Sequence, residues 1–239
     1  MAGEIFTVAG GKGGIGKTTT TINTGVALQE AGHDTVVVDA DLGMTNLGKL
    51  LDLDHQPRLH HVLAGEAEMS EAITDGPGGL SILAGHESLE AFAHGDPSNL
   101  RPVLHSLARN YDAVLVDTGA GISQETMIPM DASDGVLLVT TPKSVSTVDA
   151  RKMVDLAERV ETDVVGAVVT KADGDTDVTA VADELGENVL SVVPQDKEAT
   201  TQEPLVVTAS ESYAAQAYRR LAMKLTDYIG TPVTQAVES

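Results

Sequence analysis

The chain has 239 residues, of which 42% are apolar and 21% charged, a composition typical of a globular protein with one sizeable core. Acidic residues number 36 against 15 basic ones, and a formal net charge of −21 disfavours binding to phosphate backbones or anionic lipid headgroups. The absence of Cys excludes a disulfide framework and Cys-ligated zinc or iron–sulfur sites. Because the N-terminus is not basic and no run approaches the ~18 apolar residues of a membrane span, we expect a cytoplasmic protein.

The balance of residue types suggests a second reading of the charge. Asp outnumbers Glu, Lys is scarce and Trp is absent, which resembles proteins of salt-loving (halophilic) organisms. Near 1 M salt the Debye length is about 3 Å, so the charge would serve solvation, and it argues less strongly against nucleic acid. We still expect no DNA binding, because Arg151, Lys152 and Arg159 are too few for a basic patch.

Seven apolar runs rich in Val, Ile and Leu predict strands. They are Ile5–Ala9, Thr35–Val38, Leu80–Leu83, Ala113–Val116, Val136–Thr140, Val164–Val169 and Val189–Val193. Between and after them, helical patterns predict helices at Thr18–Ala31, Asn99–Ala108, Ser146–Val160, Asp177–Leu185 and Glu211–Ile229. Gly32 stands where a left-handed helix cap is favoured, and Asp75–Gly79 has the composition of a surface turn.

This alternation predicts an α/β fold. Near-continuous apolar strands are buried on both faces, so we expect three layers, with a mostly parallel twisted sheet covered by helices on both faces. No linker is long enough to divide the chain. We therefore expect a single domain over residues 1–230, followed by a short polar tail over residues 231–239.

A phosphate-binding pattern follows the first predicted strand. The residues from Gly11 to Thr18 match G-x-x-x-x-G-K-[ST], with a strand before the pattern and a helix after it. Glycines let backbone N–H groups converge on phosphate oxygens, the helix N-terminus adds its dipole, Lys17 adds a positive charge, and Thr18 offers a hydroxyl to Mg²⁺. The pattern predicts a nucleotide phosphate site.

The same loop resembles the deviant Walker A motif of the MinD/ParA family of P-loop ATPases, whose mark is a second lysine near the start of the loop. The matching residues are Gly11, Lys12, Gly13, Gly14, Ile15, Gly16, Lys17, Thr18 and, next to them, Thr19. The resemblance implies a P-loop NTPase fold, with ATP and Mg²⁺ as cofactors. It also implies an ATP-dependent homodimer in which Lys12 reaches the nucleotide of the partner subunit, while Lys17 binds phosphate in its own subunit.

Carboxylates follow two predicted strands. Asp39 and Asp41 run off the second strand, and Asp117 ends another, so all three lie at the edge where open α/β sheets bind ligands. By resemblance to the family's switch segments, Asp41 orients the attacking water, Asp39 lies near Mg²⁺ or its waters, and Asp117 holds a Mg²⁺-bound water. The implied catalytic residues are Lys12, Lys17 and Asp41, and the implied metal-binding residues are Thr18, Asp39 and Asp117. The sequence departs from the family at Thr118-Gly119, where Ser-Pro is usual, so we expect a more mobile second switch.

Two segments are candidates for binding the base. Thr170-Lys171-Ala172-Asp173 matches the [NT]KxD pattern by which related GTPases read guanine, which makes Thr170 and Asp173 candidates. Pro194 and Asp196 resemble the family's Pro-x-Asp segment beside adenine. We favour ATP over GTP, because Lys12 and the first switch segment outweigh this four-residue match.

The last residues differ from those of membrane-cycling members of the family. These end in a basic amphipathic helix, whereas Pro232 and the absence of Lys, Arg, Phe and Trp after Leu225 argue against one here. We therefore do not expect direct membrane binding. The apolar stripe of the last predicted helix, which includes Tyr218 and Leu221, is better explained by packing on the domain.

The function implied is a Mg²⁺-dependent ATPase that acts as a dimerisation switch in spatial positioning, for cell division, cell shape, motility or partitioning. We expect slow hydrolysis without an unidentified protein partner or activator, which would also recruit it to a membrane or cell pole. Two alternatives stay open, a nucleotide-gated adaptor with negligible hydrolysis and a GTPase that uses Thr170–Asp173. A metal-cluster carrier is disfavoured, because there is no Cys to ligate the cluster.

Overall fold

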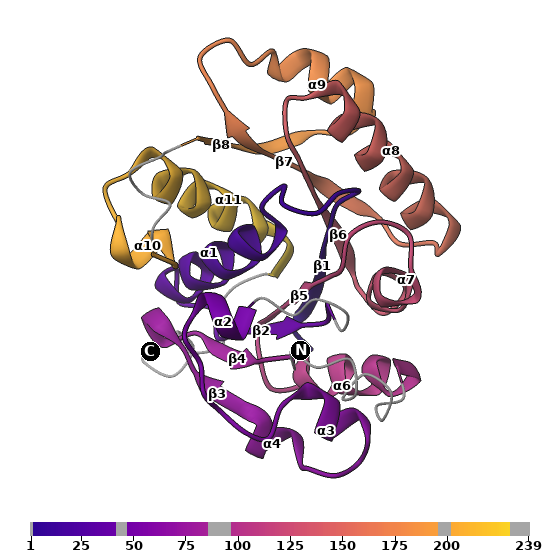
Figure 1. Ribbon diagram of the computed structural model, residues 1–239, viewed down its shortest axis with the longest axis vertical. Helices are drawn as coiled ribbons and strands as arrows, with labels where there is room; N and C mark the ends of the chain where they lie inside the picture. The colour runs from indigo at the N-terminus through magenta and orange to yellow at the C-terminus, as the bar shows by residue number, and fades with distance from the viewer. Residues whose placement is uncertain (1, 42–46, 86–96, 196–201, 230–239) are drawn as a thin grey trace.

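A twisted sheet of eight strands runs through the protein (Figure 1). The computed structural model describes residues 2–41, 47–85, 97–195 and 202–229. In spatial order the strands are β3 (Ile73–Asp75), β4 (Ser81–Leu83), β2 (Thr35–Asp39), β5 (Ala113–Asp117), β1 (Glu4–Ala9), β6 (Gly135–Thr140), β7 (Val164–Ala172) and β8 (Val189–Pro194). Only β3 is antiparallel to its neighbour within this sheet.

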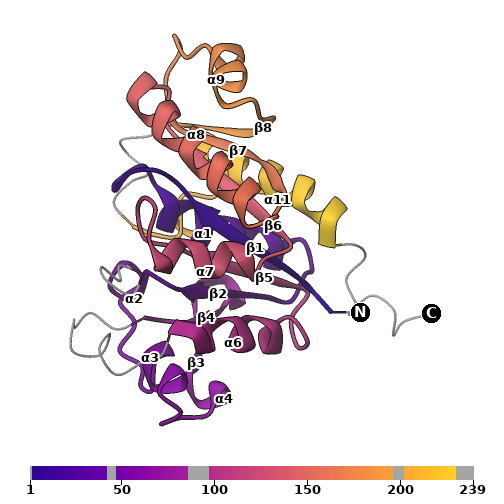
Figure 2. The same ribbon diagram turned by 90° about the vertical axis from the view of Figure 1, so that its right-hand side faces the viewer.

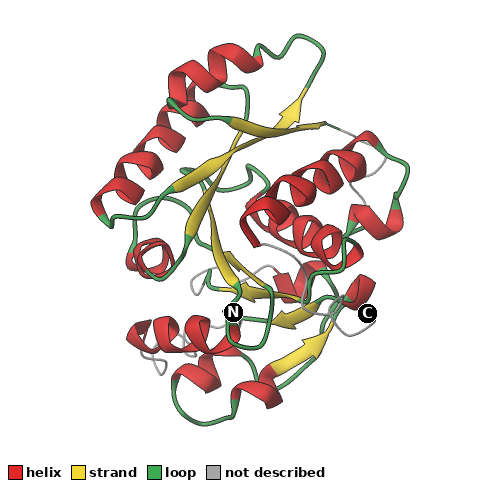
Figure 3. Ribbon diagram, turned by 180° about the vertical axis from the view of Figure 1, so that it is seen from behind, coloured by secondary structure: helices red, strands yellow, loops and turns green. Residues whose placement is uncertain are grey.

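Helices cover both faces of the sheet (Figures 2 and 3). One face packs against α1 (Lys17–Glu30), α10 (Leu205–Thr208) and α11 (Tyr213–Ile229). The other packs against α6 (Leu100–Leu107), α7 (Gln124–Asp131), α8 (Ser144–Arg159) and α9 (Val178–Leu185). Shorter elements complete the chain, namely α2 (Leu47–Leu50), α3 (Leu59–Leu63), α4 (Met69–Ala72) and the 3₁₀ turns η1 (Pro77–Gly79) and η2 (Pro97–Asn99).

The alternation of side chains along the strands separates the two cores. Phe6 and Val8 of β1 pack on the side of α1 and α11, whereas Ile5 and Ala9 of the same strand face the opposite layer. Successive strand residues point to opposite faces, so a strand covered on both sides must be apolar throughout. The predicted three-layer α/β fold is therefore confirmed.

Most predicted elements are confirmed with small shifts of their ends. All seven strands are present, and β7 extends three residues further than predicted, to Ala172. The five helices are also present, although α8 begins two residues earlier and α11 two residues later than predicted. Gly32 has the predicted left-handed conformation, with φ 94°.

Besides the short helices α2, α3, α4 and α10 and the 3₁₀ turn η2, the strand β3 and the longer helix α7 were not predicted. The strand β3 is three residues long and pairs antiparallel with β4, so its sequence offers too little periodicity to recognise. The helix α7 contains Pro129, a residue that removes a helical hydrogen bond and usually interrupts a helix. Its buried residues nevertheless pack against the sheet and bring Met130 into the core.

The packing of α11 gives a first test. Leu221 of α11 is fully buried in the core that α11 forms with α1 and the sheet, whereas Met223 on the same helix is 68% exposed. We expect Leu221→Ala to lower the free energy of unfolding by about 2–5 kcal/mol. Met223→Ala should change it by less than about 0.5 kcal/mol. Denaturant unfolding followed by circular dichroism measures both, and equal losses would contradict the packing described.

Candidate functional site

The loop between β1 and α1 has a backbone that only small residues permit. Gly16 begins α1 with φ 98°, and Gly14 has φ 72°, both in the left-handed region. A Cβ added to Gly11 would lie 2.4 Å from the Cβ of Asp149 on α8. The loop therefore lies close against α8, while Lys12, Gly13 and Gly14 are exposed at its tip.

The end of β7 supports the loop from one side. The Thr170 hydroxyl donates to the Ile15 carbonyl oxygen at 2.5 Å, and Lys171 Nζ donates to the Gly14 carbonyl oxygen at 2.5 Å. These bonds hold two carbonyls of the loop on one side. Residues that the sequence assigned to base recognition therefore also fix the conformation of the phosphate loop.

Lys17 is buried beneath the loop. Its Nζ lies 3.5 Å from the Lys12 carbonyl oxygen, and burial lowers the pKa of its ammonium group, an effect that the nearby carboxylates of Asp117 and Asp41 oppose. The lysine thus supplies a positive charge at the base of the loop, as the motif predicts.

Two carboxylates are buried beside it at the carboxyl ends of neighbouring strands. The parallel pairing of β2 with β5 places Asp39 directly opposite Asp117. Thr18 Oγ1 donates to Asp117 Oδ2 at 2.6 Å. Burial raises the pKa of Asp117 to about 6, and burial followed by repulsion from Asp117 raises the pKa of Asp39 well above its usual value. The site therefore lacks positive charge to balance its carboxylates.

Asp39 also holds both ends of the segment that follows β2. Its two carboxylate oxygens accept hydrogen bonds from the backbone N–H of Asp41, at 3.3 Å, and of Leu47, at 3.4 Å. Residues 42–46, which carry the rest of the resemblance to the first switch, lie outside the described residues. A change in the charge around Asp39 would thus alter the hydrogen bonds at both ends of that segment.

The second switch segment lies next to Asp41. A Cβ added to Gly119 would be 3.4 Å from Asp41 Oδ1 and 3.2 Å from Glu125 Oε2. Burial raises the pKa of Glu125, and the charge of Asp41 raises it further. Thr118 Oγ1 donates to the Val8 carbonyl oxygen at 2.9 Å. That bond anchors the start of the segment to β1, and the expected mobility of the segment stays a prediction.

The donor set around Thr18 fits Mg²⁺. The Thr18 hydroxyl and the Asp117 and Asp39 carboxylates are hard oxygen donors, and Mg²⁺ is usually held by one or two carboxylates together with substrate phosphates. Among the residues that the structure describes, no group of three or more His, Cys, Asp or Glu side chains could hold a metal alone. A Mg²⁺ ion held by these residues would therefore need phosphate oxygens and water as further ligands.

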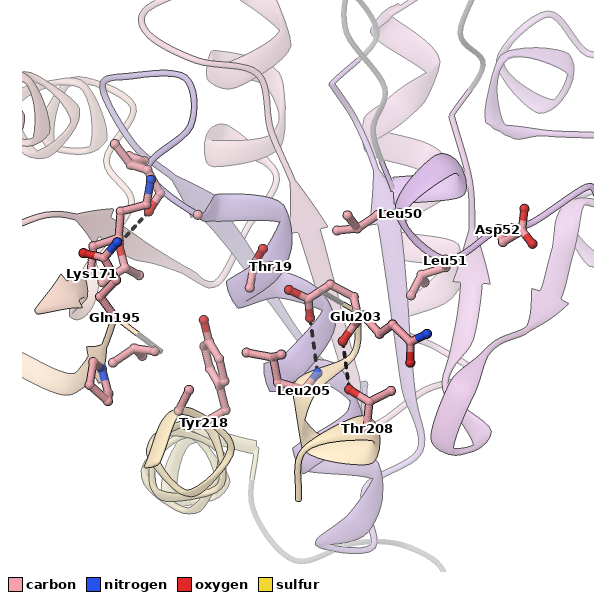
Figure 4. Close-up of a pocket in the computed structure, with 17 residues that line it drawn as sticks. Thr19, Leu50, Leu51, Asp52, Lys171, Gln195, Glu203, Leu205, Thr208 and Tyr218 are labelled. Carbon is pink, nitrogen blue, oxygen red and sulfur yellow. Dashed lines mark hydrogen bonds between the residues drawn. The ribbon is translucent and has the colours of Figure 1, made fainter. Parts of the chain in front are cut away.

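A cavity of about 660 Å³ opens beside the loop (Figure 4). Ile15, Gly16 and Thr19 form the part nearest the loop, and Thr170 and Pro194 line it from the ends of β7 and β8, while their role in binding the base stays a prediction. Figure 4 shows Lys171 and Gln195 on one side of Thr19 and Glu203 on the other. Its volume and its mixed apolar and polar lining suit a nucleoside.

Of the other two predicted base-binding residues, only Asp173 is among the described residues. Asp173 lines a neighbouring hollow that is also lined by Tyr213 and Arg220, and its Oδ1 accepts hydrogen bonds from Asp175 N and Thr176 Oγ1. Asp196 lies outside the described residues. The Asp of the guanine-reading pattern therefore serves as a turn cap in this structure.

Several lining residues were not predicted, and all of them except Gln195, which lies between Pro194 and Asp196, come from segments without a nucleotide-binding motif. They are Leu50, Leu51, Asp52, Gln195, Gln202, Glu203, Leu205 and Thr208. Tyr218 was expected only to pack α11 on the domain, and it also reaches the cavity. The apolar stripe of α11 predicts that Tyr218 is buried, but it does not predict that this side chain also borders a cavity.

Lys12 points to the outer surface of the loop. Its Nζ lies 3.9 Å from Asp149 Oδ2, and its side chain is 48% exposed. Lys152 binds the same carboxylate more closely, at 2.8 Å, and that hydrogen bond lowers the pKa of Asp149. The exposed apolar side chains of Val145 and Val148 lie on the same helix as Asp149.

Comparison with known proteins places the chain in a family. The model for the CobQ/CobB/MinD/ParA nucleotide binding domain matches residues 6–203. An uncharacterised ATP-binding protein of Methanocaldococcus jannaschii is 37% identical over 226 residues, which cover 91% of this chain and 86% of that protein.

Two solved structures of similar proteins share the fold. The cell division ATPase MinD of Pyrococcus furiosus has a TM-score of 0.89 at 32% identity, covering 95% of this chain and 99% of that one. The septum site-determining protein MinD of Pyrococcus horikoshii, complexed with Mg-ADP, has a TM-score of 0.89 at 33% identity, covering 95% and 97%.

The chain therefore belongs to the CobQ/CobB/MinD/ParA family of nucleotide-binding domains, and its resemblance to MinD/ParA ATPases is confirmed. The expected cofactors, ATP and Mg²⁺, agree with the Mg-ADP bound by the Pyrococcus horikoshii protein. No helix in the described ranges has the length and apolarity needed to cross a bilayer.

The buried carboxylates make a prediction about pH. Because the pKa of Asp117 is about 6 in the folded protein and near 3.8 when exposed, the folded state binds the proton more tightly. The contribution of Asp117 to the free energy of unfolding should therefore fall as the pH rises from about 4 through 6. Asp117→Asn cannot ionise, so its stability relative to the wild type should increase over this range. Thermal unfolding in EDTA at fixed salt measures this difference, and a difference independent of pH would contradict the burial of a charged Asp117.

Proposed function

We propose that this protein is a Mg²⁺-dependent ATPase whose two subunits dimerise around bound ATP and separate after hydrolysis. The observation that carries the proposal is the pair of lysines on one loop. Lys17 is buried with the carboxylates, whereas Lys12 is half exposed and directed away from that cluster. A charge presented outward is suited to the phosphates of a facing subunit, in the manner of an arginine finger.

The surface around Lys12 supports a second copy as the partner. Ile122 of the second switch segment and Val145 and Val148 of α8 are exposed apolar side chains. The hydrogen bond from Gly121 N to the Gly10 carbonyl oxygen, at 3.3 Å, joins the second switch segment to the loop. A dimer that buries these side chains would remove apolar surface from water and bring two Lys12 residues to two nucleotides.

Hydrolysis would use Asp41. Its carboxylate lies next to Gly119 and the second switch, close to the end of the site that the γ-phosphate would occupy above Lys17. From there it can orient a water in line with the leaving group. Phosphoryl transfer depends on positioning and electrostatics, so turnover should be slow until a protein partner completes the geometry.

The likeness to the two MinD structures favours a role in placing other proteins in the cell. We propose that the ATP-bound dimer docks on a partner, which brings it to a membrane or pole, and that hydrolysis releases it. A GTPase is less well supported, because Asp173 caps its own turn. An adaptor that binds ATP without turnover differs from our proposal only in the hydrolysis rate.

Lys12 and Lys152 allow a matched test of dimerisation, because both contact Asp149. We expect Lys12→Ala to abolish the dimer that wild-type protein forms with a non-hydrolysable ATP analogue, while the variant still binds the analogue as a monomer. Lys152→Ala should dimerise like the wild type. Analytical ultracentrifugation measures the species present, and an unchanged dimer in Lys12→Ala would overturn the role in trans.

Asp41 allows a test of hydrolysis. We expect Asp41→Ala to lower the ATP turnover rate by about 100-fold or more, the usual effect of removing a residue that positions water or accepts its proton. The variant should still form the ATP-dependent dimer. Phosphate release assays at fixed salt give the rate, with Asp175→Ala, an exposed carboxylate in another loop, as control. Equal turnover in Asp41→Ala and wild type would remove Asp41 from the reaction.

A further inference from the structure

Glu203 is a carboxylate in the wall of the 660 Å³ cavity that no motif explains. Its Oε2 accepts a hydrogen bond from Asn23 Nδ2 at 2.6 Å and another from the backbone N–H of Leu205 at 3.2 Å. Among the described residues, no ion pair to Lys, Arg or His is present at Glu203. A partly buried carboxylate without a cation needs further donors.

Asn23 fixes that carboxylate in place. The Asn23 side chain is fully buried on α1, and its Nδ2 also donates to the Thr19 carbonyl oxygen at 2.8 Å. Its Oδ1 accepts from the backbone N–H of Val206 at 3.0 Å. The amide therefore joins the first turns of α1 to the start of α10, and Glu203 is held at a set distance from the phosphate loop.

The Glu203 carboxylate can accept a ligand donor besides the hydrogen bonds that it receives from Asn23, Leu205 and Thr19, because its two oxygens offer about four acceptor positions. The two hydrogen bonds given above both end on Oε2, and Figure 4 shows the other oxygen directed toward the side of Thr19, away from Leu205. Burial raises the pKa of Glu203, and the hydrogen bonds from the Asn23 side chain, the Leu205 backbone N–H and the Thr19 hydroxyl oppose that effect. A carboxylate accepts hydrogen bonds and repels phosphate, so the ligand group that it contacts must be a donor.

The order of groups along a nucleotide identifies that donor. Thr19 lines the cavity and directly follows Thr18, which is the predicted ligand of the metal beside the phosphates. The space beside Thr19 is therefore where the group of the nucleotide next to the phosphates would lie. In a nucleotide that group is the ribose, whose 2′- and 3′-hydroxyls are donors. The base, one group further on, would lie toward Lys171, Pro194 and Gln195. Acidic residues bind ribose hydroxyls in the same way in other nucleotide-binding folds.

We propose that Glu203, positioned by Asn23, binds the ribose hydroxyls of the nucleotide and makes the site selective for ribonucleotides over deoxyribonucleotides. This inference rests on the proposed nucleotide-binding function. Hydrogen bonds to charged groups are strong, so loss of one hydroxyl should weaken binding by about tenfold or more.

The test compares nucleotides in calorimetric titrations with Mg²⁺ at fixed salt. We expect the wild-type protein to bind ADP about tenfold or more tightly than 2′-deoxy-ADP or 3′-deoxy-ADP. In Glu203→Ala this preference should fall to about twofold or less, mainly through weaker ADP binding. Glu203→Gln keeps the size of the side chain, and its preference for ADP over the deoxy-nucleotides should be several-fold smaller than that of the wild type. If Glu203→Ala does not fold, Glu203→Gln tests the inference.

The control is Asp155→Asn, which neutralises an exposed carboxylate on α8 outside this cavity and should keep the wild-type preference. The inference is overturned if wild-type protein binds ADP and both deoxy-nucleotides equally, or if the Glu203 variants keep the preference. It is also overturned if these variants change only the preference for ADP over inosine diphosphate, because Glu203 would then contact the base. Wild-type protein that binds none of these nucleotides would contradict the proposed function itself.

Discussion

The burial of two carboxylates and one ammonium group at the carboxyl edge of the sheet is the constraint on which the rest of the structure depends. Asp39 and Asp117 face each other across β2 and β5, and Lys17 lies beneath the loop beside them. Buried charges are costly unless they are paired, and the raised pKa values of both carboxylates show that pairing within the chain is incomplete. A Mg²⁺ ion bound here would supply the positive charge that the two carboxylates lack.

The same groups connect the nucleotide to the surface. Asp39 accepts hydrogen bonds from both ends of the segment after β2, and Asp41 lies against the second switch segment. The second switch carries Ile122, and it is joined to the loop that carries Lys12. Under the proposed function, a change of charge at the phosphates would be transmitted over a few hydrogen bonds to the surface on which a partner subunit would dock.

Much of this site could be predicted from the sequence, because its parts are local. The phosphate loop is contiguous, and Asp39 and Asp117 follow apolar strands whose carboxyl ends meet at one edge. The wall of the cavity could not be predicted, since Glu203, Leu205 and Tyr218 reach it from segments that are distant in sequence from the loop. Asp173 matched a short pattern, but the pattern does not specify the turn in which the side chain binds its own backbone. The helix α7 could not be predicted either, because it contains Pro129 and proline usually interrupts a helix.

The measurement that tests the account most directly is the affinity of the wild-type protein for ADP with Mg²⁺ and with EDTA, at equal ionic strength. If the metal supplies the charge that Asp39 and Asp117 lack, ADP should bind about tenfold or more tightly with Mg²⁺, because a cation held by these carboxylates would attract the negatively charged phosphates. The effect should be strongest above pH 6, where Asp117 is ionised. Equal affinity under both conditions would show that the buried carboxylates do not hold a metal, and would contradict the account.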